Sequence, residues 1–299
     1  MTLYTQAESN IRKTWLFITL FLIFIIALGW LFSYLLNNSL FLIVAVIFSI
    51  FSSFLSYWHS DKIVLRITQA QPIKKEDNPE LYRLVENLCI TAGLPLPKIC
   101  ILPESQPNAF ATGRDENHAV IAVTKGLLER LERVELEGVI AHELSHIGNK
   151  DMLLGTVVVI LVGIIALLSN FFLRITFWGG MRRRDSKGSL GLLILILGLV
   201  AAVLAPIAAS LIRLAISRKR EFLADASGAL LTRYPEDLAR ALEKISSDQT
   251  PMKVANNSTA HLFISSPFKG EQRKSWFTRI FMTHPPVEER TRALRGMKI

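Results

Sequence analysis

The most telling stretch of this chain reads Ala141-His142-Glu143-Leu144-Ser145-His146. Residues four apart share one face of an α-helix, so both histidines can reach the same metal ion. The glutamate beside the first imidazole can take a proton from a water molecule bound to that metal. The pattern therefore predicts a helix that carries a zinc site for hydrolysis of peptide bonds.

The residues before this motif predict that its helix is buried. From residue 127 to 140 apolar side chains recur at helical spacing, and the last turn before His142 is the most apolar. A buried pair of histidines beside a buried carboxylate is unfavourable unless the group binds something. Two ordinary histidines at the surface or at a helix end are the alternative, which this apolar context disfavours.

Four long uncharged segments predict membrane helices. The chain has 299 residues, 51% of them hydrophobic, and its mean hydropathy of +0.35 is high for a soluble protein. Each segment is long enough to cross a hydrocarbon layer of about 30 Å as a helix. A buried core helix is the alternative for each, but such helices rarely run so long without a charge. The predicted spans cover residues 15–36, 39–58, 152–173 and 189–212.

Basic residues beside the spans predict which side of the membrane each part faces. The net charge is +9, and positive residues flanking apolar spans mark the cytoplasmic side. The charge therefore reflects membrane topology rather than nucleic-acid binding. The amino terminus and residues 59–151 should face the cytoplasm of a multi-pass inner-membrane protein. The flanking residues are Arg12, Lys13, Lys62, Arg66, Lys74, Lys75, Arg213, Arg218, Lys219 and Arg220.

The connection between the third and fourth spans departs from this rule. Residues 174–187 are rich in arginine, with a single Asp185, and their charge would also place them inside. Either this hairpin crosses despite its charge, or the two segments are embedded without fully crossing. In both cases the residues after 212 lie on the same side as the His-Glu motif.

A catalytic zinc site needs a third protein ligand, and the segment after the fourth span offers two candidates. Glu221 and Asp225 are four residues apart on a predicted helix. One carboxylate can therefore bind the metal while the other turns toward a ligand histidine and fixes its tautomer. A solvated helix face with alternating charge is the alternative.

These motifs together resemble those of the HtpX-type membrane metalloproteases, a family related to the CAAX prenyl endopeptidases. The order of two spans, a protease segment, two more spans and a carboxyl-terminal segment is similar as well, so the resemblance covers nearly the whole chain. The matching stretches are His142-Glu143-Leu144-Ser145-His146, Glu221-Phe222-Leu223-Ala224-Asp225, Pro107-Asn108-Ala109-Phe110-Ala111-Thr112-Gly113 and Thr283-His284-Pro285-Pro286-Val287-Glu288-Glu289-Arg290.

The resemblance implies a mainly α-helical integral membrane protein with four transmembrane helices and a cytoplasmic α+β, gluzincin-like metalloprotease domain. It implies one Zn²⁺ per chain bound by His142, His146 and Glu221, with Asp225 behind a ligand histidine. Glu143 would be the general base. His284 would donate to the oxyanion formed on attack, or else be a turn residue without substrate contact.

Two short strands are predicted before the motif helix, at residues 108–111 and 118–124 around a polar turn. In proteases of this type an edge strand near the zinc pairs with the extended substrate backbone. Asn108, Ala109 and Phe110 are therefore candidate substrate-binding residues. A hairpin that only supports the helix is the alternative.

The chain divides into four predicted parts. Residues 1–58 form an amino-terminal membrane hairpin, and 59–151 form a cytoplasmic protease segment with the His-Glu motif. Residues 152–212 form a second hydrophobic hairpin, and 213–299 form a cytoplasmic segment with the third ligand.

At 1.5 Å per helical residue, the predicted metal site would lie within roughly 10 to 15 Å of the membrane boundary.

These features predict a zinc-dependent endopeptidase that acts on membrane proteins or peptides at the cytoplasmic face. The resemblance implies quality control of misfolded or damaged membrane proteins under stress. A CAAX-type prenyl-peptide endoprotease and a non-enzymatic zinc-binding membrane scaffold remain as alternatives. The uncharged spans argue against an ion pathway, and the presence of Glu143 argues against a form that binds without cutting. The sequence indicates no oligomeric state.

Two remaining features bear less on function. Cys89 and Cys100 lack a close Cys-x-x-Cys spacing, which predicts two buried thiols rather than a disulfide framework or a thiolate zinc site. Residues 246–276 are rich in serine, asparagine and basic side chains, and predict a loop over or near the site.

Overall fold

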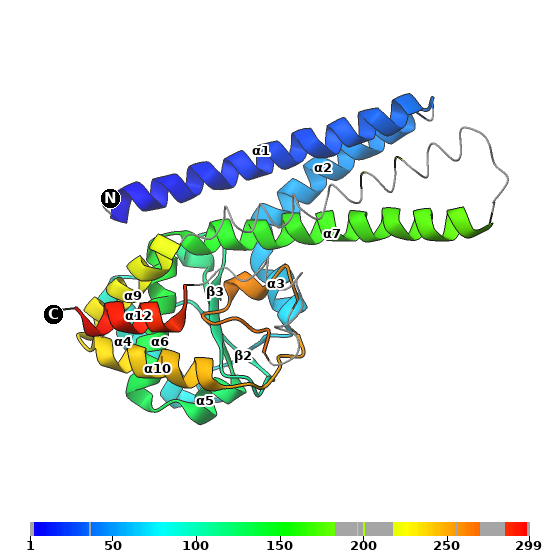
Figure 1. Ribbon diagram of the computed structural model, residues 1–299. Coiled ribbons are helices and arrows are strands. Elements are labelled where there is room, and N and C mark those ends of the chain that lie inside the picture. Colours follow the sequence, from blue (N-terminus) through cyan, green and yellow to red (C-terminus); the bar gives the residue numbers. More distant parts are fainter. Residues whose placement is uncertain are drawn as a thin grey trace.

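Three long helices extend side by side away from a body that holds the sheet and the shorter helices (Figure 1). The computed structural model describes residues 3–35, 37–182, 196, 200, 218–254, 256–269 and 285–297. The long helices are α1 (Leu3–Leu35), α2 (Leu40–Trp58) and α7 (Asp151–Arg182).

These helices contain the candidate membrane spans of the described residues. The spans are Ala7–Leu35, Leu40–Trp58 and Asp151–Phe171, with 29, 19 and 21 residues. They match the first three predicted spans, and the first begins earlier than the sequence predicted. The fourth predicted span, 189–212, lies outside the described residues except for 196 and 200.

The side chains of α2 are arranged as expected for a helix in lipid. Its large apolar residues point outward, with Val44 and Ile47 each 63% exposed. Its buried residues are all serines, and small residues allow close packing between membrane helices. Helices α1 and α2 also pack closely at Gly29 of α1, because a Cβ there would lie 2.2 Å from the Cβ of Ala45 in α2. The buried serines are Ser49, Ser52, Ser53 and Ser56.

The body contains a four-stranded sheet in the order β1-β2-β4-β3, which lies below α7 in the view of Figure 1. Strand β2 pairs with β4 in parallel and β3 pairs with β4 antiparallel, which leaves β3 at an edge. The predicted hairpin is therefore present, with β3 on the side of the His-Glu helix. The strands are β1 (Gln71–Pro72), β2 (Lys98–Leu102), β3 (Ala109–Thr112) and β4 (Val120–Thr124), and the turn η1 (Glu116–His118) lies between β3 and β4.

Each face of the sheet packs against different helices, because successive side chains along a strand point to opposite faces. Ile99 and Ile121 lie in the core with α4 (Pro79–Ala92) and α6 (Arg133–Gly148). Phe110 and Cys100 lie in a second core with α3 (Ser60–Thr68) and Val159 of α7. Both Cys89 and Cys100 are buried and unpaired, as predicted.

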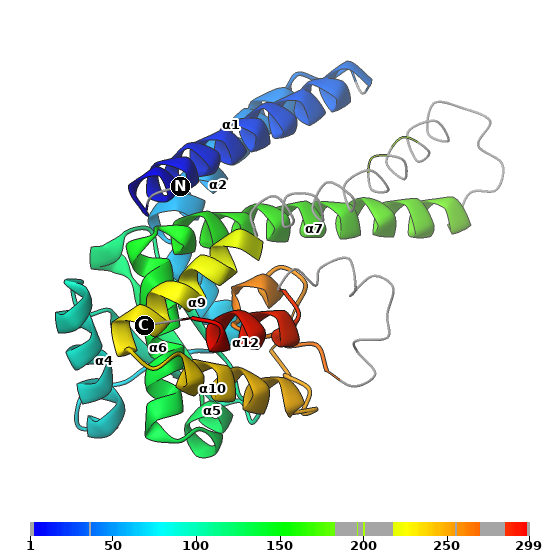
Figure 2. The same cartoon turned by 60° about the vertical axis from the view of Figure 1, so that its left-hand side comes forward.

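Helix α6 is the centre of the body, with α4 and the carboxyl-terminal helices on different sides of it (Figure 2). Its start is capped by Glu135, whose carboxylate accepts a hydrogen bond from the Glu132 backbone at 2.9 Å. It ends at Gly148 and is followed at once by α7. The helices around it also include α5 (Lys125–Arg130), α9 (Arg218–Thr232), α10 (Pro235–Ser247), η2 (Ala260–Leu262) and α12 (Val287–Arg295).

Candidate metal centre

Helix α6 presents the two motif histidines on one face. Both Nε2 atoms point to the same spot and lie 3.1 Å apart. His142 is fully buried, and Glu143 beside it is 1% exposed. The helical spacing of the motif therefore produces the predicted convergence of the two imidazoles.

Helix α9 brings the predicted third ligand to the same place. Glu221 Oε1 lies 3.8 Å from His146 Nε2, and one ligand atom from each of His142, His146 and Glu221 lies within 4.8 Å of the others. The helices approach this closely because Gly228 has no side chain. A Cβ at that position would lie 2.9 Å from the backbone nitrogen of His142.

This donor set fits a zinc ion. Tetrahedral zinc with ligands at about 2.0–2.1 Å has ligand–ligand distances of about 3.3 Å. The distance of 3.1 Å between the two Nε2 atoms and that of 3.8 Å from His146 Nε2 to Glu221 Oε1 lie on either side of that value, and all three ligand atoms lie within 4.8 Å of one another. Two imidazoles and one carboxylate also leave the fourth position for water, as in catalytic zinc sites.

A carboxylate lies behind each of the two imidazoles. His142 Nδ1 is 3.0 Å from Asp225 Oδ1, and His146 Nδ1 is 3.2 Å from Asp151 Oδ2. A carboxylate at Nδ1 keeps the proton there and leaves the Nε2 lone pair for a metal. The sequence predicted this role for Asp225. It missed Asp151, the first residue of α7.

Arg290 of α12 holds Asp225 in a two-pronged ion pair. Its Nε donates to Oδ2 at 2.8 Å and its Nη2 to Oδ1 at 2.6 Å. Its Nη1 donates to the carbonyl of Ile264 at 3.0 Å and lies 3.7 Å from Glu221 Oε2. Arg290 is only 1% exposed. The sequence motif contained this arginine but gave no indication of its role.

The surroundings shift the pKa values of the site carboxylates in opposite directions. Burial raises the pKa of Glu143 to about 7, which suits a group that must accept and release a proton near neutral pH. Burial would also raise the pKa of Asp225, but the charge and hydrogen bonds of Arg290 outweigh it and hold the value at about 2. Asp225 therefore stays ionised while Glu143 can change its charge.

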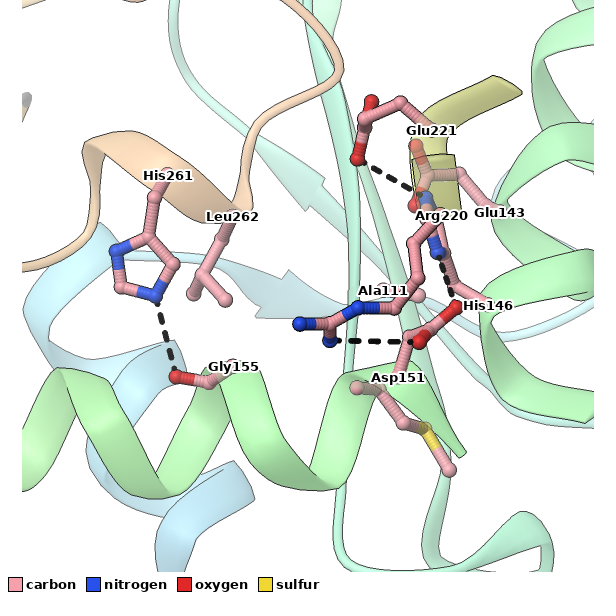
Figure 3. A pocket seen from close by; sticks show the side chains of 10 residues that line it. Ala111, Glu143, His146, Asp151, Gly155, Arg220, Glu221, His261 and Leu262 are labelled. Atoms are coloured by element: carbon pink, nitrogen blue, oxygen red, sulfur yellow. Dashed lines mark hydrogen bonds and ion pairs between the residues drawn. The ribbon is translucent and has the colours of Figure 1, made fainter. Parts of the chain in front are cut away.

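A pocket opens beside Glu143, His146 and Glu221 (Figure 3). Figure 3 shows His146 between Glu221 and Asp151, with Arg220 reaching toward Asp151 from α9. Arg220 Nη1 lies 3.5 Å from Asp151 Oδ1. The other lining residues come from β3, the start of α7 and η2. They are Ala111, Met152, Gly155, His261 and Leu262.

The residues predicted to bind substrate do not line this pocket. Asn108, Ala109 and Phe110 are fully buried, because the chain after η2 covers them. The carbonyl of Ala109 accepts a hydrogen bond from the Ile264 backbone at 2.9 Å. The amide of Asn108 donates to the Ser265 carbonyl at 2.9 Å.

The strand residue that lines the pocket is Ala111. Phe110, its neighbour, packs edge-to-face on Phe263, with 5.1 Å between ring centroids. The prediction of an edge strand is therefore confirmed for β3. The residue of this strand that lines the pocket is Ala111, further along the chain than the predicted Asn108, Ala109 and Phe110. The covering by residues 263–265 depends on tertiary packing and has no local signal.

Two further predictions concern the carboxyl-terminal third. The candidate oxyanion donor His284 lies outside the described residues. Of the predicted loop 246–276, residues 256–269 pass beside the pocket and contribute His261 and Leu262 to its lining. His261 Nε2 lies 3.2 Å from the carbonyl oxygen of Gly155 in α7. Sequence reasoning did not single out this histidine.

Comparisons with known proteins give the chain close relatives along its full length. Residues 75–298 match Peptidase family M48. The chain is 46% identical to "Protease HtpX homolog" of Caldanaerobacter subterraneus subsp. tengcongensis over 301 aligned residues, covering 100% of this chain and 99% of the relative. It is 49% identical to the protein of that name from Pyrococcus furiosus, over 85% of this chain and 86% of the relative. A solved structure, "Crystal Structure of S. mikatae Ste24p", aligns with a TM-score of 0.49 and 20% identity, over 94% of this chain and 66% of that chain.

Proposed function

The chain belongs to peptidase family M48, together with the HtpX-type proteases, and we propose that it is a zinc-dependent endopeptidase of the membrane. His142, His146 and Glu221 bind one Zn²⁺ per chain, and Glu143 is the general base. The observation that carries this proposal is the convergence of the three ligand atoms within 4.8 Å of one another, directly beside a buried glutamate.

Each group of the site has a part in peptide hydrolysis. A bound zinc ion supplies a Lewis acid for the scissile carbonyl and acidifies its water ligand. Glu143 would accept a proton from the attacking water and pass it to the leaving nitrogen, a role for which its burial beside the pocket suits it. Asp225 and Asp151 hold the histidines with their Nε2 atoms toward the metal. His284 remains the candidate donor to the oxyanion.

The peptide substrate pairs with β3 at Ala111. Backbone groups along a strand alternate in direction, so the N–H and C=O of Ala111 point the same way as those of Ala109. The Ala109 carbonyl is already bonded to Ile264, whereas Ala111 lines the pocket, where its N–H donates to the Glu143 carboxylate. An extended peptide whose N–H donates to the Ala111 carbonyl places its scissile bond beside the general base by β-augmentation.

The substrates are membrane proteins or their exposed segments at the cytoplasmic face of the inner membrane. The site directly adjoins the first turn of α7, whose candidate span begins at Asp151. With the fourth predicted span, 189–212, the chain has four crossings and a cytoplasmic, gluzincin-like protease domain. Quality control of damaged or misfolded membrane proteins is the cellular role that the resemblance to the HtpX-type proteases implies, and the placement of the site at a candidate membrane span supports it.

The test compares the purified full-length protein with its Glu143→Gln variant in cleavage of casein. We expect cleavage by the wild type, loss after chelation and recovery on addition of zinc. The variant should bind zinc normally and cleave at least about a hundredfold more slowly, as for loss of a general base. Zinc binding without chelator-sensitive cleavage would contradict the proposal and favour a scaffold. A farnesylated CAAX peptide, offered in parallel, distinguishes a prenyl-peptide protease.

A further inference from the structure

We propose that Asn10 of the first membrane helix is a positioning residue of the metal centre, acting on His146 through Asp151. This inference rests on the proposed zinc site and adds a residue far from it in the sequence. Asn10 Nδ2 donates to Asp151 Oδ1 at 2.6 Å across 141 residues of sequence. The other oxygen of the same carboxylate lies 3.2 Å from His146 Nδ1.

The direction of these hydrogen bonds is fixed by the partners. Asn10 Nδ2 also donates to the backbone carbonyl of Asn149 at 3.1 Å. Both partners are acceptors, so only the NH₂ end of the amide can serve them, and the opposite orientation would set oxygen against oxygen. Asn10 therefore uses both amide hydrogens on the short turn between α6 and α7.

That turn connects the His-Glu helix to the third membrane helix. Helix α6 ends at Gly148 and α7 begins at Asp151, and Lys150 between them adopts a left-handed conformation with φ of 56°. Such a conformation is unfavourable for a residue with a side chain and persists when neighbouring contacts hold it. Asn10 bonds to the residues on either side of Lys150, which fixes the direction of the Asp151 carboxylate.

A packing role alone does not account for an asparagine at this position. Asn10 is fully buried, and its Oδ1 has no hydrogen-bond partner among the described residues. A buried polar group with an unpaired atom costs stability relative to an apolar side chain. The amide is therefore better explained by what its NH₂ group does for Asp151.

Among the described residues, Arg220 also faces this oxygen of Asp151, and Lys13 of α1 adds a positive charge nearby. The Nη1 atom of Arg220 lies 3.5 Å from Oδ1, beyond the usual length of a strong charge-assisted hydrogen bond. The 2.6 Å contact from Asn10 is much shorter. The position of the Oδ1 atom is thus set mainly from α1, and the first membrane helix forms part of the support of the metal centre.

The experiment measures zinc and cobalt binding by the full-length protein in detergent. The variants are Asn10→Leu, Asp151→Asn, their combination, and Thr14→Val as the matched control. Thr14 is fully buried one turn along α1, and its hydroxyl donates to the Asn10 carbonyl of its own helix at 2.9 Å. Zinc affinity is read by competition with a chromophoric chelator, and the visible spectrum of the cobalt form reports the ligand geometry.

We expect Asn10→Leu to remain folded and to weaken zinc binding roughly tenfold, the low end of the loss seen when an outer partner of a ligand histidine is removed. Its cobalt spectrum should differ from the wild type, while Thr14→Val should match the wild type in both readouts. The double variant should bind no more weakly than Asp151→Asn, because both changes break one chain of contacts. Asn10→Ala should behave like Asn10→Leu and serves if the leucine variant does not fold.

Three results would overturn the inference. Wild-type affinity and an unchanged cobalt spectrum in the folded Asn10 variants would show that the amide only packs the helix. If the loss of zinc affinity in the double variant equals the product of the two single losses, Asn10 does not act through Asp151. Failure of the wild type itself to bind one zinc ion would remove the proposed function together with this inference, and the first two results would leave that function intact.

Discussion

The two proposed ligand histidines are supported from different parts of the molecule. Behind His142, Asp225 is 2% exposed and paired in two places with Arg290, all within the body. Behind His146, Asp151 belongs to a candidate membrane helix and takes its contacts from Asn10 and Arg220. Asp151 and Arg220 line the pocket, whereas Asp225 and Arg290 do not. If the site binds zinc as proposed, His142 is supported from the interior of the body and His146 from the side that lines the pocket.

The largest effect is expected for Arg290→Met on the body side. The change leaves Asp225 buried beside Glu221 without its cation, and loss of one partner of a buried ion pair costs about 3–5 kcal/mol of folding stability. Chemical denaturation monitored by circular dichroism measures this loss. Arg295→Met on the same helix is the matched control, since Arg295 pairs with Glu236 and Glu243 at the surface. Equal midpoints for the two variants would refute the proposed importance of the buried pair.

A smaller loss is expected for Gly228→Ala, which disturbs the contact of α9 with α6. The added Cβ would lie 2.9 Å from the His142 nitrogen and 3.1 Å from its Cα, so the helices must separate, at a cost of about 1–3 kcal/mol. Separation also moves Glu221 away from the histidines and should weaken zinc binding. Gly163→Ala in α7 is the control, because its nearest atom would be 4.0 Å away. Unchanged zinc affinity and stability in Gly228→Ala would contradict this account.

On the membrane side, Asp151→Asn should act on the metal more than on the fold. The amide can no longer stabilise the Nδ1 proton of His146 as strongly, so zinc affinity should fall about 10- to 100-fold. The unfolding midpoint should move less than in Arg290→Met, because the Asp151 side chain lines the pocket and is 8% exposed, against 3% for that of Asp225. Isothermal titration with zinc gives the affinity. A larger stability loss than that of Arg290→Met would reverse the comparison between the two supports.

The smallest effect is expected for the reaction rate of the two buried thiols, which reports whether the body stays folded. Burial raises the pKa values of Cys89 and Cys100 to about 11, and the thiolate is the reactive form. At pH 8 the native protein should react slowly with a thiol reagent, and faster as the pH rises toward 11. Unfolding returns the pKa to about 8.5 and accelerates the reaction. Absorbance measurements should find Asp151→Asn as slow as the wild type and Arg290→Met faster.

The sequence predicted the parts of the site that follow from local spacing. His142 and His146 are one helical turn apart, and so are Glu221 and Asp225, which makes their shared faces predictable. The same holds for the hairpin and the first three spans, whose patterns are continuous along the chain. Tertiary packing determines the rest. Asn10 and Asp151 look like ordinary polar residues near the ends of apolar helices.

Other features were hidden for the same reason. Arg290 lies in a short helix with several charged residues, Val287–Arg295, and only its packing turns this one side chain inward. Asn108, Ala109 and Phe110 were assigned to substrate because they precede the motif in an edge strand. They are covered by residues 263–265, which lie far away in the sequence: Asn108 and its partner Ser265 are 157 residues apart.

X-ray absorption at the zinc edge of the zinc-loaded full-length protein tests the central claim most directly. The account predicts one zinc ion per chain with two imidazole ligands and a first shell of nitrogen and oxygen at about 2.0–2.1 Å. In the Glu221→Gln variant the affinity should fall while the signature of two imidazoles persists. A shell with fewer than two imidazoles, or one that contains sulfur, would contradict the assignment of His142, His146 and Glu221.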